Sequence, residues 1–174
     1  METEPDPPAV REGRIIVPGG SRQLAVYGLF PPPVTQQRMV QAGTRAFAVK
    51  VYEPELLWVR FDELCAPGAS GEDFSLLPPG PDVWVIDGVP SPEPSDSGHR
   101  ADAWEHFAAV LAVLARRNVT LFVVGTRPMD WAAASEQADD ARLRSAFADI
   151  GRLLAKLKRI ESDEPVPLEG VSGS

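Results

Sequence analysis

The sequence contains few cysteines and histidines and no long apolar run, and each shortage excludes a class of protein. Cys65 is the single cysteine among 174 residues, so the chain cannot form an internal disulfide. No cysteine and histidine cluster has the spacing of zinc ligands. No stretch approaches the roughly 20 apolar residues of a membrane span, and residues 1–8 are acidic, unlike a signal peptide. We therefore expect a cytoplasmic protein with no bound metal and no membrane span.

Basic residues are also scarce relative to acidic ones. The chain has 17 lysines and arginines against 25 aspartates and glutamates, which gives a formal net charge of -8. A protein that neutralises nucleic-acid phosphates shows the opposite balance, so we expect no nucleic-acid partner. Hydrophobic residues make up 44% of the chain and charged residues 24%, which is typical of a globular domain.

The strongest pattern in the chain lies between Asp82 and Pro128. Two short apolar runs, Val83–Ile86 and Val119–Val124, flank an amphipathic segment at Ala103–Arg116. This order predicts a βαβ unit whose parallel strands are buried on both faces. The pattern therefore indicates the α/β fold class, with a mixed or parallel sheet and flanking helices.

We expect one α/β domain over residues 13–161. Residues 1–12 are acidic and proline-rich and predict a flexible lead-in, and residues 162–174 predict a loose tail. Further elements expected within the domain are a hairpin of Arg14–Val17 and Gln23–Phe30, a helix at Val34–Ala42, a hairpin of Arg45–Tyr52 and Leu56–Arg60, a helical turn at Glu72–Leu77, and a helix from Asp139 to Ile160.

Polar side chains follow the two strands of the predicted βαβ unit. Ligands of open α/β sheets bind at the carboxyl ends of the strands, so Asp87, Thr126 and Arg127 are the first candidates for a binding site. A hydroxyl and a guanidinium suit an anion. The alternatives are an aspartate that ends a buried strand and a polar turn that leads to the next helix.

Val83–Asp87 has the form of a Walker B strand, in which an aspartate holds the magnesium ion of an ATPase. The next residue is Gly88, where a hydrolytic ATPase of the AAA type carries a glutamate. No phosphate-binding Gly-x-x-x-x-Gly-Lys-Ser/Thr loop exists in the chain, and Pro18–Arg22 lacks both its spacing and its lysine. These features predict a degenerate relative of the P-loop NTPases.

The remaining reactive residues favour structural roles. His99 is expected in a loop and His106 in a helix, neither beside a nucleophile, and Cys65 follows apolar residues like a buried small hydrophobe. All four tryptophans are expected in the core or at its rim: Trp58, Trp84, Trp104 and Trp131. We find no catalytic constellation and expect a protein that is not an enzyme.

The middle and the end of the chain resemble the C-terminal part of the ZapE family, AAA-type ATPases linked to bacterial cell division. The resemblance covers roughly residues 45–160. The residues that carry it are Phe61, Leu64 and Cys65, the pair Asp73–Phe74, the strand end Asp87–Pro90, His106–Phe107 in a helix, and Gly151–Leu153 in the last helix. In the family the last motif is serine-arginine-leucine, which places Arg152 among the candidate nucleotide contacts.

The resemblance implies a shortened relative that lacks the Walker A region. We expect a non-catalytic protein-binding or assembly subunit with no cofactor, whose partner is a true ATPase or a larger assembly. One alternative is an enzyme that binds or hydrolyses nucleotide, using ATP and magnesium at Asp87, Thr126 and Arg127. Another is a purely structural component of a larger complex.

Overall fold

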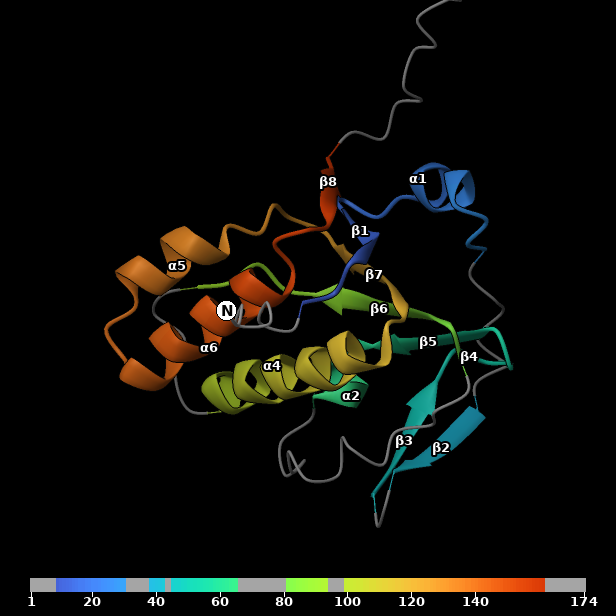
Figure 1. Ribbon diagram of the computed structural model, residues 1–174, viewed down its shortest axis with the longest axis horizontal. Helices are drawn as coiled ribbons and strands as arrows, with labels where there is room; N and C mark the ends of the chain where they lie inside the picture. Colours follow the sequence, from blue (N-terminus) through green and yellow to red (C-terminus); the bar gives the residue numbers. More distant parts are fainter. Residues whose placement is uncertain (1–8, 31–37, 43–44, 66–80, 94–98, 162–174) are drawn as a thin grey trace, which may run out of the picture.

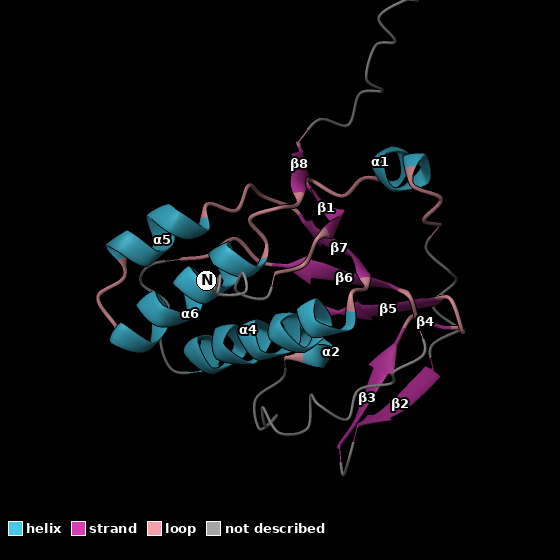
Figure 2. Cartoon of the chain, in the orientation of Figure 1, coloured by secondary structure: helices cyan, strands magenta, loops and turns pink. Residues whose placement is uncertain are grey.

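The computed structural model describes residues 9–30, 38–42, 45–65, 81–93 and 99–161. Figure 1 shows its course and Figure 2 its helices and strands. The strands are β1 (Glu12–Ile16), β2 (Arg38–Ala42), β3 (Arg45–Val49), β4 (Val51–Tyr52), β5 (Leu56–Arg60), β6 (Val83–Val89), β7 (Thr120–Gly125) and β8 (Lys158–Ile160). The helices are α1 (Ser21–Val26), α2 (Phe61–Leu64), α4 (His99–Arg117), α5 (Trp131–Gln137) and α6 (Ala141–Leu153).

Six of these strands form one sheet in the order β4-β5-β6-β7-β1-β8. Neighbouring strands are parallel from β5 to β8, and β4 is antiparallel to β5 at the edge. β2 and β3 pair in a separate antiparallel hairpin. The sheet is thus mostly parallel and flanked by helices, which confirms the predicted fold class.

The direction of the chain across the sheet decides which face each helix covers. The steps from β5 to β6 and β6 to β7 run toward β1, and the step from β7 to β8 continues past β1 in the same direction. Right-handed crossovers therefore place α2, α4, α5 and α6 on one face. The step from β1 to β5 runs the opposite way, so α1 lies on the other face (Figure 1).

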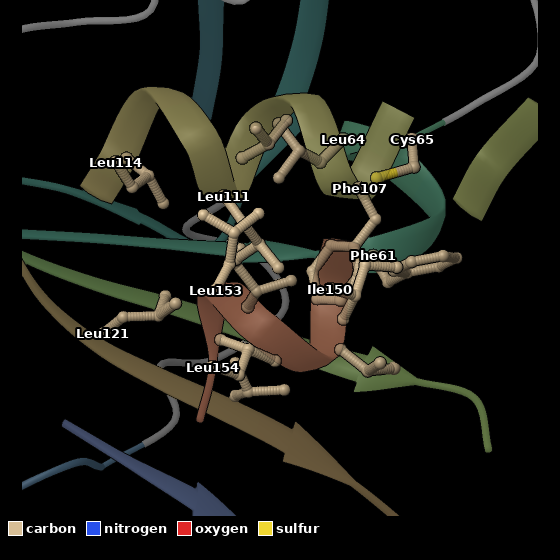
Figure 3. Packing of buried hydrophobic residues seen from close by; sticks show 14 of the residues in the cluster. Phe61, Leu64, Cys65, Phe107, Leu111, Leu114, Leu121, Ile150, Leu153 and Leu154 are labelled. Carbon is tan, nitrogen blue, oxygen red and sulfur yellow. The ribbon is translucent and has the colours of Figure 1, made fainter. Parts of the chain in front are cut away.

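The face with four helices holds the main core. α4 and α6 pack against each other over it, and Phe107, Leu111 and Ile150 point into the space between them (Figure 3). Trp104 lies in edge contact with Trp131, with 5.4 Å between the ring centroids. This layer buries most of the large apolar side chains of the described residues.

The α1 face carries a smaller cluster. Leu24 and Leu29 pack with Ile16 of β1 and with Phe122 and Val124 of β7. Alternate residues of β6 and β7 are buried on each face, as expected for strands inside a doubly covered sheet. The second face nevertheless has a much thinner cover than the first.

The structure corrects the predicted hairpin at the start of the domain. The run after Pro18 does not return as a strand, because Ser21–Val26 forms the helix α1. The helix begins here because the Gln23 side chain accepts hydrogen bonds from the N–H groups of the preceding turn. Gln23 and Leu24 are its buried residues. β1 instead pairs with β7 and β8.

Other boundaries also differ from the prediction. The predicted helix at Val34–Ala42 is wrong where the structure describes it, since Arg38–Ala42 is a strand paired with β3. The last helix ends at Leu153, and Lys158–Ile160 is a strand. Residues 9–12 belong to the fold, because Val10 is buried and its N–H donates to the Leu153 carbonyl at 2.9 Å.

Several expectations are confirmed. The βαβ unit at Asp82–Pro128 exists as β6, α4 and β7. The four tryptophans and Cys65 are buried. The hairpin predicted for Arg45–Tyr52 and Leu56–Arg60 is confirmed only at Val51–Tyr52, because Arg45–Val49 pairs with β2 instead. The expectation of a loop at His99 is wrong, because this residue begins α4. The predicted turn at Glu72–Leu77 and the tail at 162–174 lie outside the described residues.

Candidate functional site at the strand ends

A cavity of about 320 Å³ opens at the carboxyl ends of the central strands. It lies between the turn that follows β1 and the ends of β5, β6 and β7, where open α/β sheets bind their ligands. Its lining residues are Pro18, Gly19, Leu24, Lys50, Trp58, Arg60, Asp87, Gly88, Val124, Gly125 and Thr126. The site therefore combines one carboxylate, two cations and a glycine-containing turn.

Asp87 is the central group of this cavity. Its Oδ2 atom accepts hydrogen bonds from Lys50 Nζ and from Trp58 Nε1, each at 2.7 Å. Its Oδ1 atom is buried and accepts no hydrogen bond from the described residues. A buried carboxylate needs such partners because losing water without them is costly. Asp87 is thus held by an ammonium and an indole of its own chain.

Lys50 reaches Asp87 from the edge of the sheet. It follows β3, its backbone N–H donates to the Trp58 carbonyl at 2.7 Å, and its Nζ lies 5.9 Å from the centre of the Trp58 ring. Pairing of β4 with β5 sets Val51 opposite Trp58 and so fixes the position of the lysine. The Lys50 side chain is 28% exposed, so the ion pair is at the mouth of the site.

The turn after β1 is closed by a side chain. Gln23 Oε1 accepts from the backbone N–H groups of Gly19 and Gly20, at 2.8 and 3.1 Å. Gln23 Nε2 donates to the Val17 carbonyl at 2.8 Å, and the residue is buried. Successive N–H groups of such a turn are the groups that cradle phosphate in a strand–loop–helix site. Here Gln23 occupies two of those donors.

Arg60 and Gly88 form the outer wall of the cavity. Arg60 ends β5 and makes an exposed ion pair with Asp62 at 3.5 Å, a pair of small energetic value. Gly88 has a φ of +68°, which suits glycine, and the register shifts there between β6 and β7. The guanidinium of Arg60 lies over Gly88.

The structure separates the predicted site residues into two groups. Asp87 and Thr126 line the same cavity. Arg127 is exposed in the turn after β7 and does not line it. Arg152 lies on α6, is paired with Asp149 at 3.2 Å, and lines another cavity between α5 and α6. Arg152 is thus not among the groups around Asp87.

Sequence reasoning missed Lys50, Trp58, Arg60 and Gln23. Trp58 and Arg60 could have been found from the alternation of side chains along a strand, which puts them on the same face of β5. There Trp58 pairs with Val85 and Arg60 with Asp87. Lys50 and Gln23 have no comparable signal, since a short hairpin and a short helix bring them to the site.

The chemistry available at the cavity is limited. Among the described residues no group of three or more histidines, cysteines, aspartates or glutamates could hold a metal ion. Lys50, Arg60 and Thr126 could contact an anion, while a cation could use Oδ2 of Asp87 only by displacing Lys50 from it. No described helix is both long enough and apolar enough to cross a membrane.

No protein-family model, curated protein or solved structure matches this chain. The resemblance to the ZapE family therefore remains a prediction.

Proposed function

We propose that the chain is a non-catalytic protein-binding or assembly subunit, which works in the cytoplasm with a protein partner. One observation carries the proposal: Asp87 and the turn after β1, the two groups that correspond to a Walker-type site, are already bound by side chains of the chain itself. Lys50 neutralises Asp87, and Gln23 occupies the N–H groups of Gly19 and Gly20. The partner we propose is a true ATPase or a larger assembly, as the resemblance to the ZapE family implies.

The energetic cost of opening the site supports this proposal. A magnesium ion that bound Asp87 through Oδ2 would have to displace Lys50, and breaking this partly exposed ion pair costs about 2 kcal/mol when one charge stays behind. A phosphate in the turn would have to displace Gln23, which makes three hydrogen bonds there. Each hydrogen bond is worth about 1 kcal/mol net. A nucleotide would therefore need to replace several internal contacts before it gained its own.

The test is calorimetry and a phosphate-release assay with ATP, GTP and magnesium on the purified chain. We expect neither binding nor turnover by the wild-type protein. Gln23→Ala frees the N–H groups of the turn and serves as the matched variant. If this variant binds phosphate and the wild type does not, Gln23 is the group that blocks the turn. ATP turnover by the wild type that is abolished by Asp87→Ala contradicts the proposal.

A second candidate function, nucleotide binding or hydrolysis, has one observation in its favour. The structure brings Thr126, Lys50 and Arg60 around the cavity that holds Asp87, and the turn before α1 has the strand–turn–helix order of a phosphate loop. This candidate predicts micromolar ATP binding that Lys50→Met or Thr126→Ala abolishes. Loss of that binding in Arg127→Ala alone places the ligand outside the cavity described above.

A further inference from the structure

The α1 face of the central sheet is only partly covered. The connection from β1 to β5 is the step that crosses this face, and α1 is its single helix within the described residues. A six-residue helix is about 9 Å long, whereas a strand of the length of β7 extends for about 20 Å. α1 lies over the carboxyl half, at Ile16 and Val124, so no helix of the described residues covers the amino half.

The part of this face that no described helix covers is a strip that runs across five strands, from β5 to β8. Register places Leu56, Val83 and Thr120 side by side at the amino ends of β5, β6 and β7. Glu12 is the β1 partner of Thr120 in this row, and Arg14 and Lys158 pair on β1 and β8 one step further along the same face. We call Leu56, Val83, Thr120, Arg14 and Lys158 the open strip. The first four are half-buried and Lys158 is exposed, so the strip is apolar at the β5 end and basic at the β8 end.

A groove of about 430 Å³ lies along Thr120 and Arg14 of the strip. Its floor is Phe122, whose ring lies 5.4 Å from that of Tyr27, and the guanidinium of Arg14 lies 5.8 Å from the centre of the Tyr27 ring. Arg11 and Glu12 also line it. The groove therefore offers an aromatic surface with cations on its rim.

The positive charge at this end of the strip exceeds the negative charge that the described residues place beside it. Arg11, Arg14 and Lys158 make no ion pair there, and Glu12 is the one carboxylate that lines the groove. The chain as a whole carries a net charge of -8. Adjacent like charges on paired strands are unfavourable unless another group faces them. An occupant with carboxylates would satisfy them.

We propose that the open strip is the docking surface for an acidic amphipathic segment of a partner protein. Its apolar side lies on Leu56 and Val83, and its carboxylates meet Arg14 and Lys158. The inference rests on the proposed function and specifies the chemistry of its partner. A second copy of the chain fits less well, because two strips would bring like charges together or set cations on apolar residues. A nucleic acid would leave the apolar half uncovered.

The experiment measures binding of three labelled helical peptides by fluorescence anisotropy. Each has about 16 residues, enough for helix formation, and the same leucine face, with glutamate, glutamine or lysine on the other face. The variant Arg14→Glu/Lys158→Glu tests the basic end, and Leu56→Ser tests the apolar end. The control is Arg116→Glu/Arg144→Glu, which makes the same change of charge at exposed positions on α4 and α6. Circular dichroism confirms that each variant is folded.

We expect the glutamate peptide to bind about tenfold more tightly than the glutamine peptide and the lysine peptide not to bind, because each surface charge contact changes affinity severalfold. The affinity for the glutamate peptide should fall about tenfold or more in the Arg14→Glu/Lys158→Glu variant and less than about twofold in the control. Leu56→Ser should weaken all binding.

Equal affinity for all three peptides, or no binding of the glutamate peptide, overturns the inference while leaving the proposed function intact. A dimer in light scattering that Leu56→Ser disrupts assigns the strip to a second copy and also overturns it. Binding of a labelled DNA duplex that the Arg14→Glu/Lys158→Glu variant abolishes overturns it as well. Nucleotide turnover would instead refute the proposed function.

Discussion

Replacing Lys50 with methionine should measure how much the ion pair at the strand ends contributes to stability. The substitution keeps an aliphatic chain over Trp58 but leaves the Asp87 carboxylate with the indole as its donor. The Lys50 and Asp87 side chains are 28% and 12% exposed. This places the pair between exposed pairs, worth under about 1 kcal/mol, and buried pairs, whose disruption costs about 3–5 kcal/mol. We expect Lys50→Met to lower the free energy of unfolding by about 2 kcal/mol.

Urea denaturation followed by far-UV circular dichroism is the assay. With a slope of about 2 kcal/mol per molar urea, the midpoint should fall by about 1 M. The double variant Lys50→Met/Asp87→Asn removes both charges, and the asparagine oxygen still accepts from Trp58, so more than half of the loss should return. Arg60→Met is the control, because its partner Asp62 is exposed and its change should stay within about 0.5 kcal/mol.

Two results would refute this reasoning. If Lys50→Met lowers the free energy of unfolding by less than about 0.5 kcal/mol, water must stabilise the Asp87 carboxylate as well as Lys50 does. A double variant that is less stable than Lys50→Met alone would show that the carboxylate, and not its charge pairing, stabilises the site. Either result would also remove the main support for a site closed by its own residues.

Two further substitutions test the packing. Gly13→Ala should prevent folding, because a Cβ at this position, where φ is +137°, would collide with the carbonyl of Leu121, whereas Gly28→Ala, with φ +76° and open space around it, should cost about 1 kcal/mol in a thermal melt. Similar melting temperatures for the two variants would contradict the close approach of β1 to β7. In urea denaturation, Phe107→Ala should lower the free energy of unfolding by about 3–5 kcal/mol, because Phe107 is buried, and Met39→Ala, at an exposed site, by less than about 0.5 kcal/mol. Equal losses for the two variants would place Phe107 outside the core.

The elements that the sequence predicts well are those whose pattern is set by burial. β6 and β7 are continuous apolar runs, as strands buried on both faces require, and α4 repeats apolar residues at helical spacing. The two strands lie next to each other, and α4 packs against them in the same core. Local pattern and tertiary contact therefore agree in this unit. The same holds for Leu143, Phe147 and Ile150, whose helical spacing matches their burial on α6.

The elements that were predicted incorrectly depend on partners far away in the chain. The run that includes Leu24 and Val26 contains β-prone residues, but Gln23 caps the preceding turn and starts a helix. Leu157 continues the helical spacing beyond Leu153, yet it is buried in a turn that leads to β8. Leu24 and Leu157 are both buried, but in local structures that differ from those their sequence patterns predict.

The candidate site was only half predictable for the same reason. Asp87 and Thr126 stand at the ends of strands that the sequence identifies, so the strand-end rule finds them. Lys50 reaches the site through the β4–β5 pairing, and Gln23 through a helix that the pattern did not predict. The closed state of the site, on which the proposed function depends, was therefore invisible in the sequence.

The central place of β1 in the sheet has a consequence for folding during synthesis. Each residue of β1 pairs with a residue of β7 more than a hundred positions later, and its other neighbour, β8, follows later still. At about 5–20 residues per second on the ribosome, β1 waits roughly 5–20 s for its partner. The contacts that join β1 to the sheet also have a high loop-closure cost, so they form late. The first strand of the sheet to be made is thus among the last to be paired, and the β5–β6–β7 unit must stay protected from aggregation until then.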